Sequence, residues 1–233
     1  MNQIAGCDGC PAGWLLASRQ VKGGVVTAAL AETTRDLFAA LADVAVLAID
    51  IPIGLAEDGP RVCDVEARRL LGRRGSSVFP TPVRPVLRAT SYRDACRRSA
   101  RACGKMLSKQ AYSILSRIRE VDAELRFRPP AVTQVREVHP ELCFATMSGG
   151  SPMAYPKRSL EGIEERLRWI ERAFPGVFTA IRIRFRESQA ANDDILDALA
   201  ALWTAERIRA GTARTVPRDP PQDRHGLRME MVA

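Results

Sequence analysis

The sequence predicts an α/β fold in which helices flank a mixed five-stranded sheet. Residues 44–49 form an unbroken apolar run that ends at Asp50 and Pro52, which is typical of a strand buried on both faces. Short strand-like stretches precede this run, and helical patterns follow it. The 233 residues are 46% hydrophobic and 27% charged, which suits one domain, residues 1–233, with a sizeable core.

The N-terminal elements predict a meander followed by a crossover. Residues 3–8, 14–19 and 25–30 predict three strands that glycine-containing turns connect. A short helix over about 34–41 then leads into the buried strand 45–50. Three antiparallel strands, a crossover helix and a strand parallel to the first resemble the RNase H fold. In that fold the first strand is central, so strand 45–50 is expected beside it.

A basic segment follows this strand. Residues 55–130 contain predicted helices at 62–71, 91–103 and 109–124 and are too long for a plain connection, so we interpret them as a helical insertion. Residues 61–128 hold 17 Lys and Arg against 6 Asp and Glu, a net charge of +11, whereas the whole chain carries +8. Segregated positive charge favours a polyanionic partner, namely nucleic acid, DNA or RNA. A solvated helix surface is the alternative.

The C-terminal elements complete the sheet and cover it. Residues 133–139 predict the fifth strand, which Pro140 ends. Apolar residues at a spacing of three and four predict a helix over 160–174, and a last long helix is expected from Asn192, as its N-cap, to Gly211. Residues 227–232 alternate as an edge strand does.

Four aspartates are predicted to gather at one end of this sheet. Asp8 and Asp50 each end a strand, and neighbouring strands lie about 4.8 Å apart. Asp194 and Asp197 share one face of the last helix. Adjacent carboxylates repel each other unless a cation lies between them, so this oxygen-only set predicts ligands for two divalent ions, Mg²⁺ or Mn²⁺. Simple capping of a turn by Asp50 and of the helix by Asp194 is the alternative.

Further candidates lie on the fifth strand and in the insertion. Glu137 either completes the metal shell or holds an arginine of the insertion, and His139 either contacts substrate or is a structural histidine. Contacts to substrate phosphates are expected from residues in and near the proline-rich loop after Asp50: Arg73, Arg74, Ser76, Ser77 and Arg84.

These residues predict a metal-dependent nuclease. Two ions about 4 Å apart would clamp an in-line attack on phosphorus, with catalysis assigned to Asp8, Asp50, Asp194, Asp197 and Glu137. One alternative is a small-molecule phosphoesterase, with the insertion as a lid. Another is a nucleic-acid-binding protein of RNase H fold without catalysis. Phosphotransferases of the actin and sugar-kinase kind share the topology, but they need two such domains, for which 233 residues are too few.

Six motifs, in order along nearly the whole chain, carry a family resemblance: Gly6-Cys7-Asp8-Gly9-Cys10-Pro11-Ala12-Gly13-Trp14, Ile49-Asp50-Ile51-Pro52-Ile53-Gly54, Arg61-Val62-Cys63-Asp64-Val65-Glu66-Ala67-Arg68, Ser77-Val78-Phe79, Glu137-Val138-His139-Pro140-Glu141 and Asp193-Asp194-Ile195-Leu196-Asp197-Ala198. With these motifs the sequence resembles domain of unknown function 429, a family whose members are described as predicted RNase H-like nucleases. The helix motif Asp194-Ile195-Leu196-Asp197-Ala198 is in addition similar to that of Holliday-junction resolvases, where such acids bind metal. The resemblance implies that Asp8, Asp50, Asp194 and Asp197 are metal ligands.

Other classes of site and location are disfavoured. The Cys7-x-x-Cys10 pair lacks the second pair that a structural zinc site needs, so we expect reduced thiols. No apolar run reaches the ~18 residues of a membrane span, and no signal-peptide pattern is present. We therefore expect a cytoplasmic protein without a membrane partner. The sequence leaves open whether it forms a homodimer.

Overall fold

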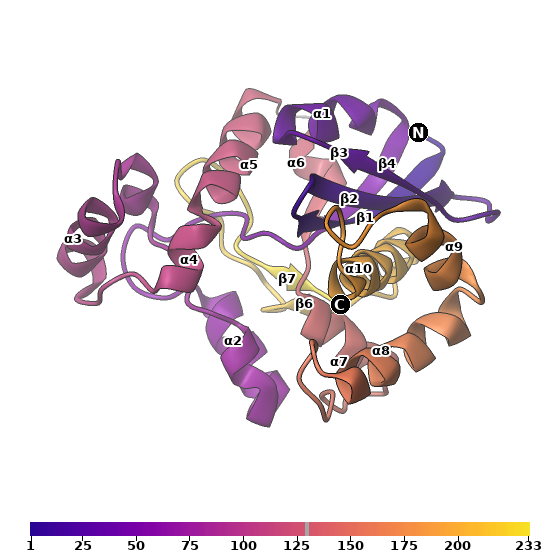
Figure 1. Ribbon diagram of the computed structural model, residues 1–233. Helices are drawn as coiled ribbons and strands as arrows, with labels where there is room; N and C mark the ends of the chain where they lie inside the picture. The colour runs from indigo at the N-terminus through magenta and orange to yellow at the C-terminus, as the bar shows by residue number, and fades with distance from the viewer. Residues whose placement is uncertain (129–130) are drawn as a thin grey trace.

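The computed structural model describes residues 1–128 and 131–233. Its centre is a five-stranded sheet in the order β3-β2-β1-β4-β5 (Figure 1). The central β1 is antiparallel to β2 and parallel to β4, which in turn is parallel to the edge strand β5. This mixed sheet confirms the predicted fold class and is consistent with an RNase H-like fold. The strands are β1 (Gln3–Cys10), β2 (Gly13–Gln20), β3 (Thr27–Ala31), β4 (Val44–Ile49) and β5 (Val135–Glu137).

Helices cover both faces of the sheet, because its strands are apolar on both sides. Ile4 and Ala48 pack with α10 (Asn192–Ala210), α7 (Pro140–Met147), α8 (Leu160–Ala173) and α9 (Val177–Arg184). Ala5 and Leu47, which point the other way, pack with α1 (Thr34–Ala39), α5 (Leu115–Phe127) and α6 (Ala131–Gln134). The result is three layers, with α10 buried against the middle of the sheet (Figure 1).

The basic segment forms a lobe beside the sheet (Figure 1). The lobe holds α2 (Val62–Leu71), two 3₁₀ turns (Gly72–Ser77 and Arg84–Arg88), α3 (Tyr92–Cys103) and α4 (Lys109–Ser113). The predicted helix over 109–124 is instead two helices, because the chain turns at Ile114. The second of these, α5, packs on the sheet through Ile118 and Val121, so it belongs to the layers. Residues 129–130, the end of the predicted insertion, lie outside the described residues.

The C-terminal half differs from expectation at three places. The predicted strand over 133–139 shortens to β5, since residues 131–134 form α6 and His139 is the N-cap of α7. Neither α7 nor α9 was expected. Residues 227–232 form only a two-residue strand, β7 (Met231–Val232), which pairs with β6 (Thr215–Val216). Within the described residues, no helix combines the length and apolar character needed to cross a membrane.

Candidate functional site

The register of β1 and β4 places Asp8 beside Asp50. Cys7 pairs with Ile49, and the amide of Asp50 donates a hydrogen bond of 3.0 Å to the carbonyl of Cys7. Paired residues of parallel strands point to the same face, and side chains alternate along a strand. Asp8 and Asp50, each one residue beyond the Cys7–Ile49 pair, therefore continue the face that packs on α10. The two predicted carboxylates thus lie side by side at the carboxyl ends of adjacent strands.

The first two turns of α10 bring further acids to the same place. Asp193, Asp194 and Asp197 are all buried, and Asp197 is only 1% exposed. The Asp194 carboxylate accepts a hydrogen bond of 2.8 Å from the amide of Ala191, so it also caps the helix. The N-cap is Ala191, and Asn192, expected in that role, is the first helical residue.

Electrostatic interactions join these acids into one cluster. Burial, followed by the charges of Asp197 and Asp50, raises the pKa of Asp8 well above its usual value. Burial and the charge of Asp197 raise the pKa of Asp50 to about 7. Burial also raises the pKa values of Asp194 and Asp197. In this setting the carboxylates favour their protonated forms, and a cation would be needed to stabilise them as anions.

Two cations that the sequence did not identify contact this cluster. Lys157 Nζ lies 2.7 Å from Asp197 Oδ2 and 3.6 Å from Asp193 Oδ2. Arg158 Nε lies 3.1 Å from Asp193 Oδ2. The other oxygen of Asp197, Oδ1, is buried and has no hydrogen-bond partner. Lys157 and Arg158 lie in an irregular segment before α8, where no periodic pattern indicates which way a side chain points.

The two strand aspartates of the cluster open onto a cleft of about 550 Å³. Asp8 and Asp50 line it from the strand ends, and Lys157 and Arg158 line it from one side. The lobe and α5 supply the opposite wall through the loop at residues 78–81 and through Gln110, Ser113, Ile114 and Arg117. The cleft therefore has an acidic floor and basic walls.

Arg117 is a fixed cation in this wall. Its guanidinium donates a hydrogen bond of 2.6 Å to the carbonyl of Cys10 and lies 5.4 Å from the centre of the Trp14 ring. It also packs against Gly9, where a Cβ would come within 2.4 Å of it. Arg117 is thus held next to β1, the strand that carries Asp8. Its place on a helix in a basic segment gave no sequence signal that separates it from its neighbours.

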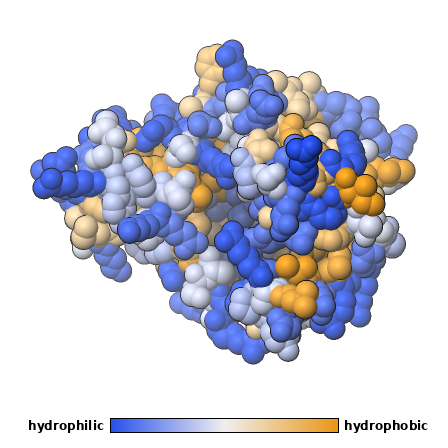
Figure 2. All heavy atoms as spheres, viewed as in Figure 1, coloured by the Kyte–Doolittle hydropathy of each residue, from blue (hydrophilic) through white to orange (hydrophobic). Residues whose placement is uncertain are grey.

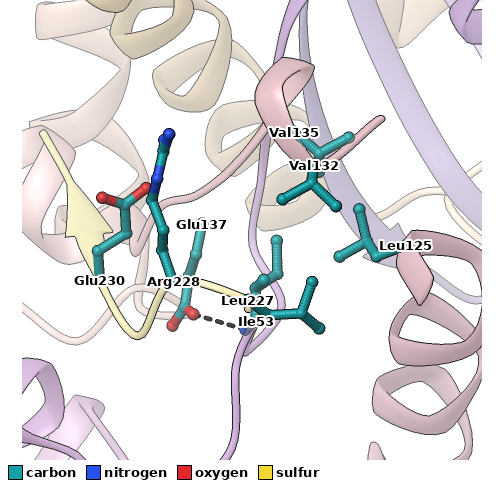
Figure 3. A pocket seen from close by; sticks show the side chains of 8 residues that line it. All are labelled: Ile53, Leu125, Val132, Val135, Glu137, Leu227, Arg228 and Glu230. Carbon is teal, nitrogen blue, oxygen red and sulfur yellow. Dashed lines mark hydrogen bonds between the residues drawn. The ribbon is translucent and has the colours of Figure 1, made fainter. Parts of the chain in front are cut away.

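Glu137 faces away from the aspartates. It pairs with Ile49 across β4 and β5, so it shares the face of Ile49, opposite to that of Asp50. Both of its oxygens accept hydrogen bonds of 2.7 Å from the Arg61 guanidinium. One also accepts a hydrogen bond of 2.6 Å from the amide of Ile53 (Figure 3). This is the second of the two arrangements expected for Glu137, in which it holds an arginine of the insertion.

The residues expected to contact phosphates fall into three groups. Arg84 is buried and pairs with Asp122 at 2.8 Å and with Asp223, so it is not available to a phosphate, which corrects that expectation. Arg73 and Ser76 are exposed in the 3₁₀ turn at 72–77.

The third group is held within the protein near the cleft. Arg74 pairs with Glu141 at 3.5 Å, and the Ser77 hydroxyl donates to the carbonyl of Arg74. His139 lines the cleft, its Nε2 lies 3.4 Å from the carbonyl of Ser77, and burial lowers its pKa.

The donor set of the cluster suits a hard divalent cation. Carboxylate oxygens are the ligands that Mg²⁺ and Mn²⁺ prefer, and Asp197 Oδ1 is a buried oxygen without a partner. Within residues 1–128 and 131–233, no three acidic, histidine or cysteine side chains are arranged as a complete ligand set for one ion. The carboxylate oxygens of the cluster are thus suitable ligands for such an ion. One of these carboxylates, that of Asp197, already contacts the Lys157 ammonium.

Comparisons with known proteins identify a family. A family model described as "Protein of unknown function (DUF429)" matches residues 6–222, a span that includes every aspartate of the cluster. No curated protein and no solved structure matches the chain.

Proposed function

This chain belongs to the DUF429 family of proteins of unknown function. From the geometry of its own residues we propose that it is a metal-dependent nuclease. The observation that supports this best is the convergence of Asp8 and Asp50, which line the cleft, with the buried Asp197 of α10; all three have raised pKa values. The reaction adds water across a phosphodiester bond. The water oxygen bonds to phosphorus, the bond to the leaving oxygen breaks, and that oxygen ends with a proton.

Divalent ions, Mg²⁺ or Mn²⁺, would bind to the carboxylates of Asp8, Asp50 and Asp197, while Asp194 caps α10. Such an ion activates a water molecule and neutralises charge on the phosphate when it is bound. The chain itself supplies the orientation. Arg117, fixed by the Cys10 carbonyl and the Trp14 ring, and Arg158, whose side chain is 82% exposed, are placed to hold phosphate oxygens at the two sides of the cleft.

Nucleic acid is the proposed substrate because the positive charge extends beyond the cleft. Arg93, Arg97 and Arg101 are exposed at intervals of four along α3, so they share one face of that helix. Hydrophilic side chains cover the outer end of this lobe (Figure 2). A polyanion can contact the cleft and the lobe together, whereas a small phosphoester can reach only the cleft.

A small-molecule phosphoesterase is the second candidate. The observation that favours it is the wall that the loop at 78–81 and α4 place over the carboxylates. The volume of about 550 Å³ falls within the range of small-ligand pockets. Salt dependence separates the two candidates, since binding of a polyanion weakens steeply as salt rises and binding of a small phosphoester does not.

The test is cleavage of branched DNA, RNA–DNA hybrid, single strands and a small chromogenic phosphodiester with Mg²⁺ or Mn²⁺. We expect ion-dependent cleavage of a nucleic acid that falls by about 10²–10³-fold or more in Asp8→Asn. Asp58→Asn, at an exposed aspartate, is the matched control and should cleave as the wild type does. Equal cleavage by Asp8→Asn and wild type would refute the proposal. Hydrolysis of the small diester alone would favour the second candidate, and binding without cleavage would indicate the non-catalytic alternative.

A further inference from the structure

Lys157 enters the carboxylate cluster from outside the sheet and α10. It lies in the segment that joins α7 and α8, and its side chain is 38% exposed at the rim of the cleft. Its ammonium lies 2.7 Å from Asp197 Oδ2, and its charge lowers the pKa values of Asp8, Asp50 and Asp197. An ammonium is a compact point charge, so at this distance it occupies the side of the carboxylate where a metal ion would otherwise bind.

Charge balance limits how many further cations the cluster needs. Asp193 is paired with Arg158, and Asp194 caps the first turn of α10. The remaining acids, Asp8, Asp50 and Asp197, carry three negative charges when ionised, and Lys157 offsets one of them. One divalent ion then brings these groups to neutrality. A second would leave an excess of positive charge, which nearby cations such as Arg117 would increase.

The two carboxylate oxygens of Asp197 differ in their contacts. Oδ2 accepts a hydrogen bond from Lys157, whereas Oδ1 is buried and has no partner, in a side chain that is 1% exposed. A buried carboxylate oxygen without a partner is costly, and an ion bound to it would remove that cost. Asp197 therefore offers one oxygen to the fixed ammonium and one to an ion.

We propose that Lys157 takes the place of one of two divalent ions, so that this cluster binds a single ion. This inference rests on the proposed function, and it changes the expected site of two ions into one ion plus a lysine. Lys157 supplies a positive charge that needs no metal and that stays in place when the ion dissociates.

The experiment counts bound Mn²⁺ on the full-length chain. Calorimetric titration gives the stoichiometry, and electron paramagnetic resonance distinguishes an isolated Mn²⁺ ion from a magnetically coupled pair. We expect one uncoupled ion for the wild type. For Lys157→Met we expect a coupled pair, because the position of the Lys157 ammonium becomes available to a second ion. Arg168→Met is the control, because it removes an exposed cation on α8 that does not line the cleft, and it should bind one ion.

The outcomes separate this inference from the proposed function. A coupled pair in the wild type, or one ion in folded Lys157→Met, would overturn the inference. If Lys157→Met fails to fold, the number of bound ions is measured instead for the wild type and for Lys157→Arg, in which a cation remains. We expect one ion for both. One bound ion without cleavage of any phosphodiester would defeat the nuclease proposal and leave the ion count standing. No bound ion in the wild type would defeat both.

Discussion

A Cβ atom added to Gly6 would lie 1.9 Å from the backbone nitrogen of Leu202. The centre of β1 therefore touches the backbone of α10 directly, and Ala198 and Ala201 on the helix are small enough to allow it. Asp8 lies two residues beyond Gly6 on the same face, and Asp197 lies just before Ala198. This contact between backbones is what brings a strand carboxylate and a helix carboxylate together.

Gly6→Ala should accordingly destabilise the protein by about 3 kcal/mol, because its methyl group meets backbone that cannot move alone. Gly9→Ala is the matched control. There the new Cβ would meet the Arg117 side chain, at 2.4 Å, rather than backbone, so it would displace one guanidinium hydrogen bond. We expect it to cost about 1 kcal/mol. Urea unfolding measures both variants, and equal losses of stability would show that α10 does not rest on β1 in this way.

Removing a cluster carboxylate should stabilise the protein at high pH in the absence of ions. The pKa of Asp50 in the folded protein is about 7, above the usual Asp value of about 3.9. A raised pKa favours the folded state at low pH, and this contribution is lost as pH rises through the window from about 4 to 7. In EDTA, the free energy of unfolding of Asp50→Asn should equal that of the wild type near about pH 4. Above about pH 7 it should exceed that of the wild type by about 1–3 kcal/mol.

The measurement is the free energy of unfolding of both proteins across this pH range. The comparison between them cancels the titration of groups outside the cluster, such as Asp223, whose pKa is lowered, whereas Asp8 and Asp197, which interact with Asp50, contribute to the difference. A difference that does not change with pH would mean that burial and like charges do not raise the pKa of Asp50.

Much of the cluster could be predicted from sequence, because it follows from short-range patterns. An apolar run that ends in an acid identifies Asp50, a strand that ends likewise identifies Asp8, and the helical spacing of three pairs Asp194 with Asp197. The alternation of side chains between the two faces of a sheet also explains why Glu137 does not join the aspartates. Predicting this would require the register of β5, which the sequence does not reveal. The predicted strand over 133–139 is too long because its first two residues belong to α6 and because His139 is the N-cap of the helix that Pro140 begins.

The parts that could not be predicted depend on contacts between distant segments. Arg84 is buried by Asp223, 139 residues further along the chain, and no local pattern distinguishes it from the exposed arginines around it. Lys157 follows Pro156 in an irregular segment, so nothing indicates that its ammonium reaches Asp197. The composition of a basic segment therefore overstates the charge available to a ligand.

Glu137→Gln should be strongly destabilising, because it leaves the buried Arg61 guanidinium short of negative charge. We expect a loss of about 3–5 kcal/mol, as for other broken buried ion pairs. Glu124→Gln, which breaks a more exposed pair with Arg128, should cost less than about 1 kcal/mol. Both variants should bind Mn²⁺ as the wild type does. A lost ion with unchanged stability would instead make Glu137 a metal ligand.

Neutralising the basic face of α3 should weaken nucleic-acid binding in a salt-dependent manner. Replacing Arg93, Arg97 and Arg101 with Gln should reduce the slope of log affinity against log salt by about two to three. The control replaces the exposed Arg168, Arg184 and Arg186, which lie on and after α8 and α9, away from α3 (Figure 1). Fluorescence anisotropy with a labelled oligonucleotide measures the slope, and equal reductions in the two triple variants would argue against a specific basic face.

Asp8, Asp50 and Asp197 should be tolerated together as anions only when a divalent cation lies between them. The melting temperature at pH 8 of the wild type and Asp8→Asn, each with EDTA and with saturating Mn²⁺, tests this claim. We predict that Mn²⁺ raises the melting temperature of the wild type by about 5–10 °C, hardly changes that of Asp8→Asn, and that in EDTA the variant melts higher. Equal responses of the two proteins to Mn²⁺ would contradict the claim.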